Sequence, residues 1–535
     1  MTDAAAQVTA AQAGSPLLDA LRQIVGNDHV LTGDEDRRYF SSDVYREAEP
    51  AEVIVQPGTK DELARAVGAA TSAGLAVIAR GGGLSYTDGY LPSRSESMIV
   101  DMRRMDRILE INAEDMYVTV ETGCTWSALF EALKDRGLRT PYFGPLSGLR
   151  STVGGAISQN SMFFGSGVHG NSVDCVLGLE VVLADGQVLT TGSAATPYAP
   201  SPFMRSYGPD LTGNFLADTG ALGLKAVATL RLIPFPAVTL YASFAFDNFP
   251  PLCAAMSEIS RQGLAAECFA FDPTHQTRAL KRRGGFLDDF KALAGVAKSA
   301  GSVAGGVKEA ARVAVAGRRM FDDVTYSLHL VVDGRDEATA ESMMAAAREI
   351  ALGAGREIEA SLPKIMRGTP FVPPNSMLGP DGERWVPIHA LVPHSRAVAA
   401  VQAVHDFFAE NAEVVDKHGI DWGYLLCTSG AQVFLLEPVF YWQDARGLYH
   451  NRTLDDEHLA KIKTFPEDLA ARHAVDDLRE GLARMFMEMG AAHFQIGKAY
   501  LYREGRNPET YRLLEAIKDA VDPDRLVNPG SLGLA

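Results

Sequence analysis

The sequence predicts a multidomain α+β protein, and three observations support this prediction. The chain has 535 residues, which at about 150 residues per domain corresponds to two to four domains. Residues 51–83 show the pattern of a β-strand, a Pro-Gly turn, an amphipathic helix and a second strand that ends in glycines, which is a βαβ unit. Strands and helices alternate again after residue 238, which favours a second domain built on an antiparallel sheet.

The first half of the chain begins with an Ala-rich tail and a lead-in helix. Pro16 opens an amphipathic stretch that continues to Val25, and proline is well suited to the first turn of a helix. After the βαβ unit, we expect strands at Ser97–Asp101, Tyr117–Glu121, Leu179–Leu183 and Lys225–Ile233, and a helix at Trp126–Arg136. Pro234 and Pro236 close this half.

The second half restarts with a strand at TLYASFAFD and a helix at LCAAMSEISRQG, and it continues with a strand at YSLHLVVDG and an Ala-rich helix over Glu337–Ala354. The last 55 residues predict a helix, a short strand and a final helix. We therefore predict a tail and helix over 1–45, a first domain over 46–237, a second domain over 238–480 and a C-terminal segment over 481–535.

Composition excludes several classes of protein. The chain has 50 Lys and Arg against 67 Asp and Glu, a formal net charge of -17, so nucleic acid is not an expected partner. Five scattered cysteines include no CxxC pair and indicate buried thiols in a reducing compartment. No basic leader precedes an apolar run, and no run of about 18 apolar residues follows. A cytoplasmic protein without a membrane span is expected.

One segment departs from this acidic background. Residues 281–319 carry nine Lys or Arg against three acidic residues in a Gly/Ala-rich frame. We interpret the segment as a solvated helical excursion, with a membrane surface or a protein partner as the alternatives.

The strongest local signal is a glycine-rich loop after the second strand of the βαβ unit. Its sequence is Arg80-Gly81-Gly82-Gly83-Leu84-Ser85-Tyr86. Successive glycines let backbone N–H groups converge on an anion without obstruction by Cβ atoms, which suits a pyrophosphate. The loop is neither a GxGxxG that opens a helix nor a P-loop with its lysine. A structural turn is the alternative for the loop taken alone.

Three further segments follow the loop in order: PLSGLRSTVGGAISQN at 145–160, GSGVHG at 165–170 and GPDLTGNFLADTGALGLKAVATLRLIP at 208–234. In this order the four segments resemble the FAD-binding domain of the vanillyl-alcohol oxidase and p-cresol methylhydroxylase superfamily. The resemblance covers residues 46–236, and DPDRLVNPG at 522–530 resembles the family's usual terminus. It implies a two-subdomain FAD-binding domain, a ferredoxin-like antiparallel cap domain, and an active site between them.

The resemblance also implies which residues bind FAD. The pyrophosphate would lie on Arg80, Gly81, Gly82, Gly83, Leu84, Ser85 and Tyr86. The flavin and ribitol would be lined by Ser147, Thr152, Gly154, Gly155, Ser158 and Gly165. Gly220, Gly223 and Val227 would meet the adenine end, and Asn528 would help to close the site.

Two branches of the superfamily give different expectations for the substrate. The stretch Arg384–His394 resembles the Trp- and Pro-bearing strand of the phenol-oxidising branch and would point His389 towards the flavin, with a core histidine as the alternative. That branch has an E-Y-R run where this chain has His493-Phe494-Gln495, which argues against the same phenolate activation. Residues 430–433 offer neither His nor Tyr for covalent attachment, so non-covalent FAD is expected.

The branch that oxidises 2-hydroxy acids often holds a metal on a HxGDGNxH strand, which is absent here. His389 and His394 should face opposite ways on a strand, so no metal site is predicted. The family's EHGIGxxK is echoed only by HFQIGK, in which Lys498 would bind an anion or flavin N1.

Two groups of residues remain open to two interpretations. The run Glu437–Trp442 would wall a pocket for an aromatic substrate or pack a domain interface. Arg446, His450 and Arg452, expected on a loop, are either carboxylate ligands or a solvated face.

The prediction is an FAD-dependent oxidoreductase that oxidises an aromatic or bulky alcohol by hydride transfer to flavin N5. His389 or His493 would take the proton, Gln495 and Lys498 would lie near flavin N1, and Tyr441 would orient the substrate. The alternatives are a metal-independent 2-hydroxy-acid dehydrogenase and a non-catalytic flavin-binding protein. O2, a quinone or a cytochrome would accept the electrons, and a homodimer is expected.

Overall fold

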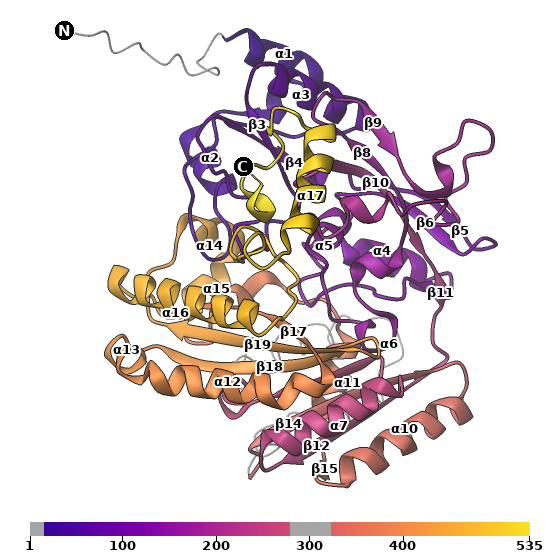
Figure 1. Ribbon diagram of the computed structural model, residues 1–535, viewed down its shortest axis with the longest axis vertical. Coiled ribbons are helices and arrows are strands. Elements are labelled where there is room, and N and C mark those ends of the chain that lie inside the picture. The colour runs from indigo at the N-terminus through magenta and orange to yellow at the C-terminus, as the bar shows by residue number, and fades with distance from the viewer. Residues whose placement is uncertain (1–14, 279–322, 535) are drawn as a thin grey trace.

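The computed structural model describes residues 15–278 and 323–534. Figure 1 shows two sheet-containing halves, one above the other. The basic segment 281–319 lies outside the described residues. The helices are α1 Pro16–Val25, α2 Asp34–Phe40, α3 Lys60–Ser72, α4 Trp126–Lys134, α5 Val153–Gln159, α6 Ser166–His169, α7 Phe249–Arg261, α10 Glu337–Leu352, α11 Ser361–Gly368, α12 Ala397–Glu410, α13 Ala412–Lys417, α14 Leu448–Thr453, α15 Asp456–Lys461, α16 Leu469–Glu488 and α17 Pro508–Val521.

The upper half contains a four-stranded and a five-stranded sheet (Figure 1). The first has the order β1-β2-β4-β3, in which β4 pairs in parallel with both β2 and β3. The second has the order β5-β6-β10-β8-β9 and is antiparallel throughout. The strands are β1 Val30–Leu31, β2 Val53–Val55, β3 Ala76–Arg80, β4 Ser97–Asp101, β5 Ile108–Asn112, β6 Tyr117–Glu121, β8 Val176–Val182, β9 Val188–Thr190 and β10 Leu224–Arg231, while β7 Leu138–Arg139 pairs with β11 Ile233–Pro234. The predicted βαβ unit is confirmed as β2, α3 and β3.

The lower half is one antiparallel sheet of eight strands. Its order is β15-β12-β14-β13-β18-β19-β16, and β17 also pairs with β19. The strands are β12 Val238–Phe246, β13 Glu267–Phe271, β14 Tyr326–Gly334, β15 Arg356–Ile358, β16 Arg384–Pro387, β17 Ala390–Pro393, β18 Asp421–Ser429 and β19 Val433–Trp442. The predicted antiparallel cap is confirmed, and its two strand-helix-strand units are β12-α7-β13 and β14-α10-β15.

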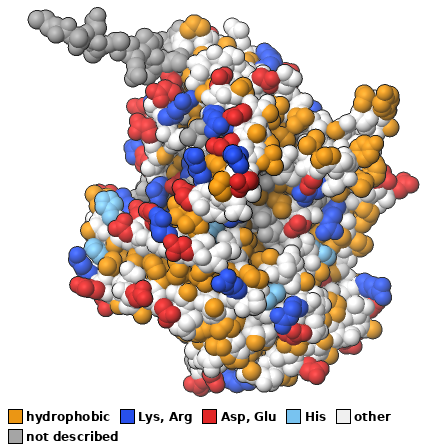
Figure 2. All heavy atoms as spheres, viewed as in Figure 1, with side chains coloured by type: hydrophobic (Ala, Val, Ile, Leu, Met, Phe, Trp, Pro, Cys, Tyr) orange, Lys and Arg blue, Asp and Glu red, His pale blue; other side chains and the backbone are white. Residues whose placement is uncertain are grey.

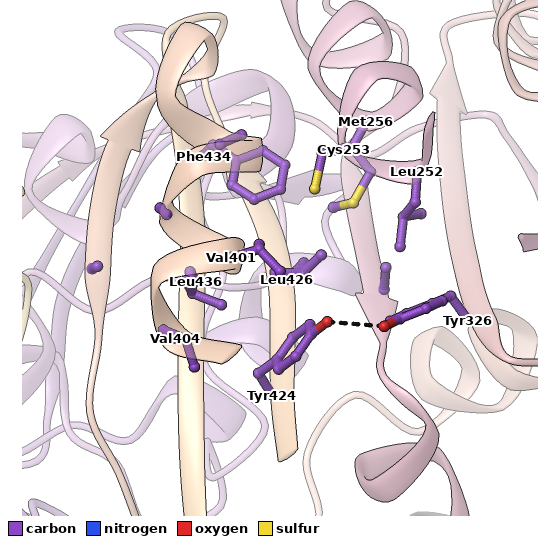
Figure 3. Packing of buried hydrophobic residues seen from close by; sticks show 14 of the residues in the cluster. Leu252, Cys253, Met256, Tyr326, Val401, Val404, Tyr424, Leu426, Phe434 and Leu436 are labelled. Carbon is purple, nitrogen blue, oxygen red and sulfur yellow. Dashed lines mark hydrogen bonds between the residues drawn. The ribbon is translucent and has the colours of Figure 1, made fainter. Parts of the chain in front are cut away.

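The core of the cap contains side chains of this sheet and of helices α7, α10, α12 and α16, and Figure 1 shows α12 beneath β18. Figure 3 shows Leu252 and Met256 of α7 and Val401 of α12 directed at the strand residues Leu426 and Leu436. All five side chains are fully buried. Apolar burial of this kind is the main favourable term in folding, so this layer fixes the sheet on which the lower wall of the site is built.

A buried group of charges joins the two halves. Arg139 on β7 pairs with Asp333 on β14 at 2.9 Å, and Arg367 on α11 pairs with both Asp333 and Glu267 at 2.6 Å. Glu267 also accepts a hydrogen bond of 2.7 Å from the Gly165 amide. Because ion pairs removed from water need several partners to offset desolvation, this cluster constrains how the halves sit against each other.

The C-terminal segment returns to the upper half. The Val77 amide of β3 donates to the Leu526 carbonyl at 2.7 Å, and the Asn528 amide donates to the Val77 carbonyl at 2.9 Å. The chain end is thereby attached beside β3, next to the glycine-rich loop.

Four local expectations were wrong. In place of the short strand expected among the last 55 residues there are two isolated bridges, Leu391 with Ala492 and Val77 with Val527. The stretch Arg384–His394 is two strands, because residues 388–389 interrupt it. The aromatic run Glu437–Trp442 does not follow a strand but belongs to β19. His450 and Arg452 lie on the short helix α14 instead of a loop.

The face shown in Figure 2 has Lys and Arg side chains interspersed with Asp and Glu. A phosphate-tracking protein instead gathers its basic residues on one surface. On the face in view, basic and acidic side chains are not separated into such surfaces.

The central role of Leu426 in the cap core can be tested with Leu426→Ala. We predict that the free energy of unfolding falls by about 2–5 kcal/mol, because the substitution removes buried methyl groups and leaves a cavity. Leu352→Ala, at an α10 position that is 49% exposed, is the control and should change it little. Denaturant unfolding followed by tryptophan fluorescence measures both, and equal effects of the two variants would contradict this assignment.

Candidate active site

The loop after β3 lies in direct contact with the turn that precedes α5. A Cβ on Gly81 would lie 2.3 Å from Thr152 Oγ1, and a Cβ on Gly82 would lie 2.0 Å from the Arg150 carbonyl oxygen. Gly83 has a φ of +74°, which L side chains rarely adopt. Glycine is therefore required here by both space and backbone conformation.

The backbone amides and carbonyls of this loop differ in their hydrogen bonding. Among the described residues, the backbone amides of 82–86 donate no hydrogen bond. The Gly83 carbonyl accepts hydrogen bonds from the hydroxyls of Tyr90, at 2.7 Å, and Tyr449. Converging unpaired amides form an anion-binding concavity.

The opposite wall of the site contains Thr152 and α5. Thr152 Oγ1 accepts a hydrogen bond of 3.2 Å from the Gly155 amide. A Cβ on Gly154 would lie 2.7 Å from Thr122 Cβ, so this helix also packs closely against its neighbour. Both walls consequently present backbone and small side chains.

These segments border a cavity of about 400 Å³ that extends from the glycine-rich loop to β18 and β19. The predicted cofactor residues on its wall are Gly81, Gly82, Gly83, Leu84, Ser85, Tyr86, Ser147, Thr152, Gly154, Gly155, Ser158, Gly220 and Gly223, and the predicted catalytic residues on it are Tyr441 and Gln495. Trp385, Glu437, Phe494 and His275 also line it. The chemistry of this wall fits a dinucleotide with a pyrophosphate. The unpaired amides of residues 82–86 could bind the pyrophosphate, and the glycines and small side chains around them leave room for it.

Four predicted cofactor residues do not line the cavity. Arg80 is fully buried and packs its guanidinium on the rings of Tyr39, Phe40 and Tyr90 at 4.8–5.2 Å. Such cation–π packing places the Arg80 side chain behind the loop.

The other three support the wall from outside it. Gly165 packs against the backbone of Pro141, because a Cβ on Gly165 would lie 2.1 Å from the Pro141 carbonyl oxygen. Val227 belongs to the core under β10. Asn528 Nδ2 donates to the Gly89 carbonyl at 2.9 Å and to the Thr219 carbonyl at 2.7 Å, which joins two wall segments.

His389 lies directly behind the cavity wall. Its Nε2 is 3.3 Å from the Tyr86 hydroxyl and 3.5 Å from Glu437 Oε2, and its Nδ1 is 2.9 Å from the Tyr500 hydroxyl. The side chain has no exposed surface. Burial, reinforced by the charge of Arg479, holds its pKa well below the ordinary value, so His389 is neutral.

His493 and Lys498 lie further from the cavity. His493 Nδ1 donates to the His389 carbonyl at 2.8 Å, and burial lowers its pKa to about 4. Lys498 Nζ donates to the Leu91 carbonyl, and burial lowers its pKa to about 8. The structure thus brings Tyr441 and Gln495 onto the wall together, but not these two residues.

Sequence reasoning placed Glu437 in a run that would wall a pocket but gave it no catalytic role. It is the only carboxylate among the described residues of the wall, and burial raises its pKa to about 8. The available signal was a lone acid inside the apolar strand FLLEPVFYW, since unpaired acids are rare in buried strands.

Comparison with known proteins identifies the cofactor. The family model for the FAD binding domain matches residues 51–192, and that for the C-terminal domain of FAD linked oxidases matches residues 495–532. These two ranges contain the glycine-rich loop, α5 and Asn528. The family models thus confirm the FAD cofactor that the sequence predicted.

Two solved structures match nearly the whole chain. They are 4-ethylphenol oxidase from Gulosibacter chungangensis (TM-score 0.71, 19% identity, 97% of this chain and 96% of that one) and p-cresol methylhydroxylase with substrate bound (TM-score 0.69, 16% identity, 97% and 96%). At these identities the two structures show that the chain shares their fold, and the two family models add that it carries the FAD binding domain and the C-terminal domain of FAD linked oxidases.

Curated relatives match over a smaller part. Glycolate oxidase subunit GlcD of Bacillus subtilis is 27% identical over 242 residues, 45% of this chain and 50% of the relative. The mitochondrial D-lactate dehydrogenase [cytochrome] of Arabidopsis thaliana is 29% identical over 244 residues, 45% and 40% respectively. The 1'-carboxy-chondrochloren decarboxylase of Chondromyces crocatus is 30% identical over 222 residues, 41% and 40%. The chain spans about half the length, or less, of these curated relatives.

In the described ranges, no helix is long and apolar enough to cross a membrane. Within the same ranges, His, Cys, Asp and Glu side chains form no group of three that could hold a metal ion.

The close approach at Gly82 can be tested with Gly82→Ala. Because the new Cβ would overlap the Arg150 carbonyl, the loop must move away from its amide geometry. We predict that FAD affinity falls at least about tenfold, a change of ~1.4 kcal/mol, measured by titrating apoprotein with FAD. Gly368→Ala, whose Cβ would meet nothing within 4 Å, is the matched control. Unchanged affinity in Gly82→Ala would refute the assignment of this loop to FAD.

Proposed function

We propose that the protein is an FAD-dependent oxidoreductase that oxidises the CH–OH group of an uncharged aromatic or bulky alcohol. The supporting observation is the lining of the cavity next to β18 and β19. There Trp385, Tyr441 and Phe494 supply aromatic surface, and Glu437 is the one carboxylate among the described wall residues. Aromatic rings that converge on few polar groups are typical of a pocket for an aromatic ligand.

The charges on the wall favour a neutral substrate over a 2-hydroxy acid. A buried carboxylate ligand needs a cation or several hydrogen bonds. The Lys and Arg residues on the described wall are Arg150 and Lys225. Lys225 Nζ is paired with Asp218 at 2.6 Å. Arg150 donates only to neutral groups, the Thr453 carbonyl and the Tyr39 hydroxyl, at 3.3 and 3.4 Å, and its backbone lies against the glycine-rich loop, where the pyrophosphate of the cofactor would bind.

FAD, when bound, supplies a two-electron oxidant that accepts hydride. The residues of this chain would hold its pyrophosphate on the amides of 82–86. They would pack the substrate ring against Trp385, Tyr441 and Phe494 and exclude water around the reacting carbon. The Gln495 amide would bind a polar atom of the flavin or substrate.

Two further points belong to this proposal. FAD is bound non-covalently, because residues 430–433 lie outside the cavity lining and offer no nucleophile. Acid precipitation should then release all of the flavin.

We also propose that the protein is a cytoplasmic homodimer whose electrons pass to O2, a quinone or a cytochrome. Turnover with each acceptor separately tests the acceptor, and sedimentation tests the dimer.

A metal-independent 2-hydroxy-acid dehydrogenase is the second candidate. It is favoured by the relatives named glycolate oxidase subunit and D-lactate dehydrogenase. A non-catalytic flavin-binding protein is the third, and it would bind FAD that no alcohol reduces.

An anaerobic titration distinguishes the three candidates. We predict that benzylic or other bulky aromatic alcohols bleach the visible flavin band of the purified holoprotein, whereas D-lactate and glycolate do not, since on the described wall Lys225 is paired with Asp218 and Arg150 lies at the glycine-rich loop. Bleaching by the hydroxy acids alone would establish the second candidate. A flavin reduced by dithionite but by no alcohol would establish the third.

A further inference from the structure

Glu437 occupies a distinctive place on the cavity wall. It lies in β19, opposite Leu425 of β18, and its side chain is 16% exposed. The neighbouring wall residues Leu425, Val439 and Phe494 are apolar. A carboxyl group in such surroundings is poorly solvated, so its ionised form is costly unless another group donates a proton or a hydrogen bond to it.

The oxygens of this carboxyl group are free to meet a ligand. Glu437 accepts no hydrogen bond from any residue in the described ranges, and its nearest polar neighbour is His389 Nε2 at 3.5 Å. Burial is the cause that raises its pKa. A carboxylate in this condition is a stronger base than an ordinary one, and proton transfer is most efficient when the pKa lies near the working pH.

The groups around His389 favour one of its two neutral tautomers. The His389 backbone amide donates to the Tyr500 hydroxyl oxygen at 2.6 Å, and the same hydroxyl lies 2.9 Å from His389 Nδ1. We assign the ring proton to Nε2, because Nε2 faces the Tyr86 hydroxyl and a Glu437 carboxylate oxygen, while the Tyr500 hydroxyl hydrogen donates to Nδ1. The Nε2–H group faces Tyr86 and Glu437. It stabilises the ionised form of Glu437, and because Nε2 already carries a proton, His389 does not compete with Glu437 for the substrate proton.

We propose that Glu437 is the catalytic base that removes the proton from the substrate hydroxyl, and that Tyr500 and His389 are positioning residues behind it. The O–H bond breaks, its proton goes to a Glu437 oxygen, and the electron pair left on oxygen forms the C=O bond. The hydrogen on the carbon departs with its electron pair as hydride to the oxidised flavin. This inference rests on the proposed function, and it moves the basic role from His389 and His493 to Glu437.

The pH dependence follows from the groups around Glu437. The titratable and charged groups that face Glu437 or the neighbouring His389 ring are Tyr86, His389, Cys427, Tyr441, His493, Tyr500 and Arg479. Burial raises the pKa values of Tyr86, Cys427 and Tyr500 and lowers those of His389 and His493. Glu437, with a pKa of about 8, is thus the group expected to titrate between pH 6 and 9, and flavin reduction should accelerate as pH rises through that range.

The test is the anaerobic reduction rate of the holoprotein, measured by stopped flow from pH 6 to 9, for the wild type and Glu437→Gln. We predict that Glu437→Gln binds FAD normally, reduces it at least roughly 100-fold more slowly, and loses the rise with pH. Glu357→Gln, at the far edge of the same sheet on β15, is the matched control and should keep the wild-type profile. A Glu437→Gln variant with wild-type rate and profile overturns the proposal.

A second readout needs no turnover. Burial also raises the pKa values of Asp43 and Asp272 to about 7, so the readout is the infrared spectrum of the wild type minus that of Glu437→Gln between pH 6 and 9. This difference should contain a protonated carboxyl band that disappears as pH rises. Tyr500→Phe should shift the pH at which this band titrates, because it removes a hydrogen-bond partner of His389. Absence of the band from the wild-type minus variant difference overturns the proposal by itself. A wild-type flavin that no alcohol reduces removes the proposed function instead.

Discussion

The site depends on the contact between the glycine-rich loop and the turn at residues 150–155. The Arg150 carbonyl and Thr152 hydroxyl occupy the space that side chains at 82 and 81 would need. Because the two segments meet backbone to backbone, the amides of 82–86 face the cavity and not a neighbouring strand. Tyr90 and Tyr449 hold the other side of the loop through the Gly83 carbonyl. Tyr449 comes from α14, far along the chain, so the geometry of the loop needs the whole fold.

The same packing creates the environment in which Glu437 and His389 act. The cap core of α7, α10 and α12 sets the position of β18 and β19, and the ion cluster of Arg139, Asp333 and Arg367 constrains the cap against the upper half. The groups between the two halves are therefore poorly hydrated. This single condition lowers the pKa of His389 and raises that of Glu437, in opposite directions because burial disfavours whichever form is charged.

Sequence patterns predicted the parts of the fold that have local causes. Periodicity identified α3, α4 and α7, and successive glycines identified the loop, because both depend on neighbours along the chain. The cofactor followed from the resemblance of four ordered motifs to a known FAD-binding family. Arg80 was assigned to the pyrophosphate from its place in the motif, but its side chain packs on rings of Tyr39, Phe40 and Tyr90. Its direction depends on those tertiary neighbours, which the motif does not contain.

The substrate half shows the same limit more strongly. His389 was recognised, but its environment depends on Tyr86 and Tyr500, which lie 303 and 111 residues away in sequence. Glu437 was predicted only as part of a pocket wall, because its poor solvation and its contact with His389 become visible only in the assembled cavity. The two-strand break at 388–389 had no clear signal in a stretch rich in proline and aliphatic residues.

The central claim is that one cavity holds the FAD pyrophosphate on the amides of 82–86 and the substrate hydroxyl at Glu437. A crystal structure of the holoprotein with an unreactive aromatic alcohol analogue tests it most directly. We predict density for the pyrophosphate on that loop and the analogue's hydroxyl within hydrogen-bond distance of a Glu437 oxygen. A pyrophosphate bound elsewhere, or an analogue whose hydroxyl lies away from Glu437, would contradict it.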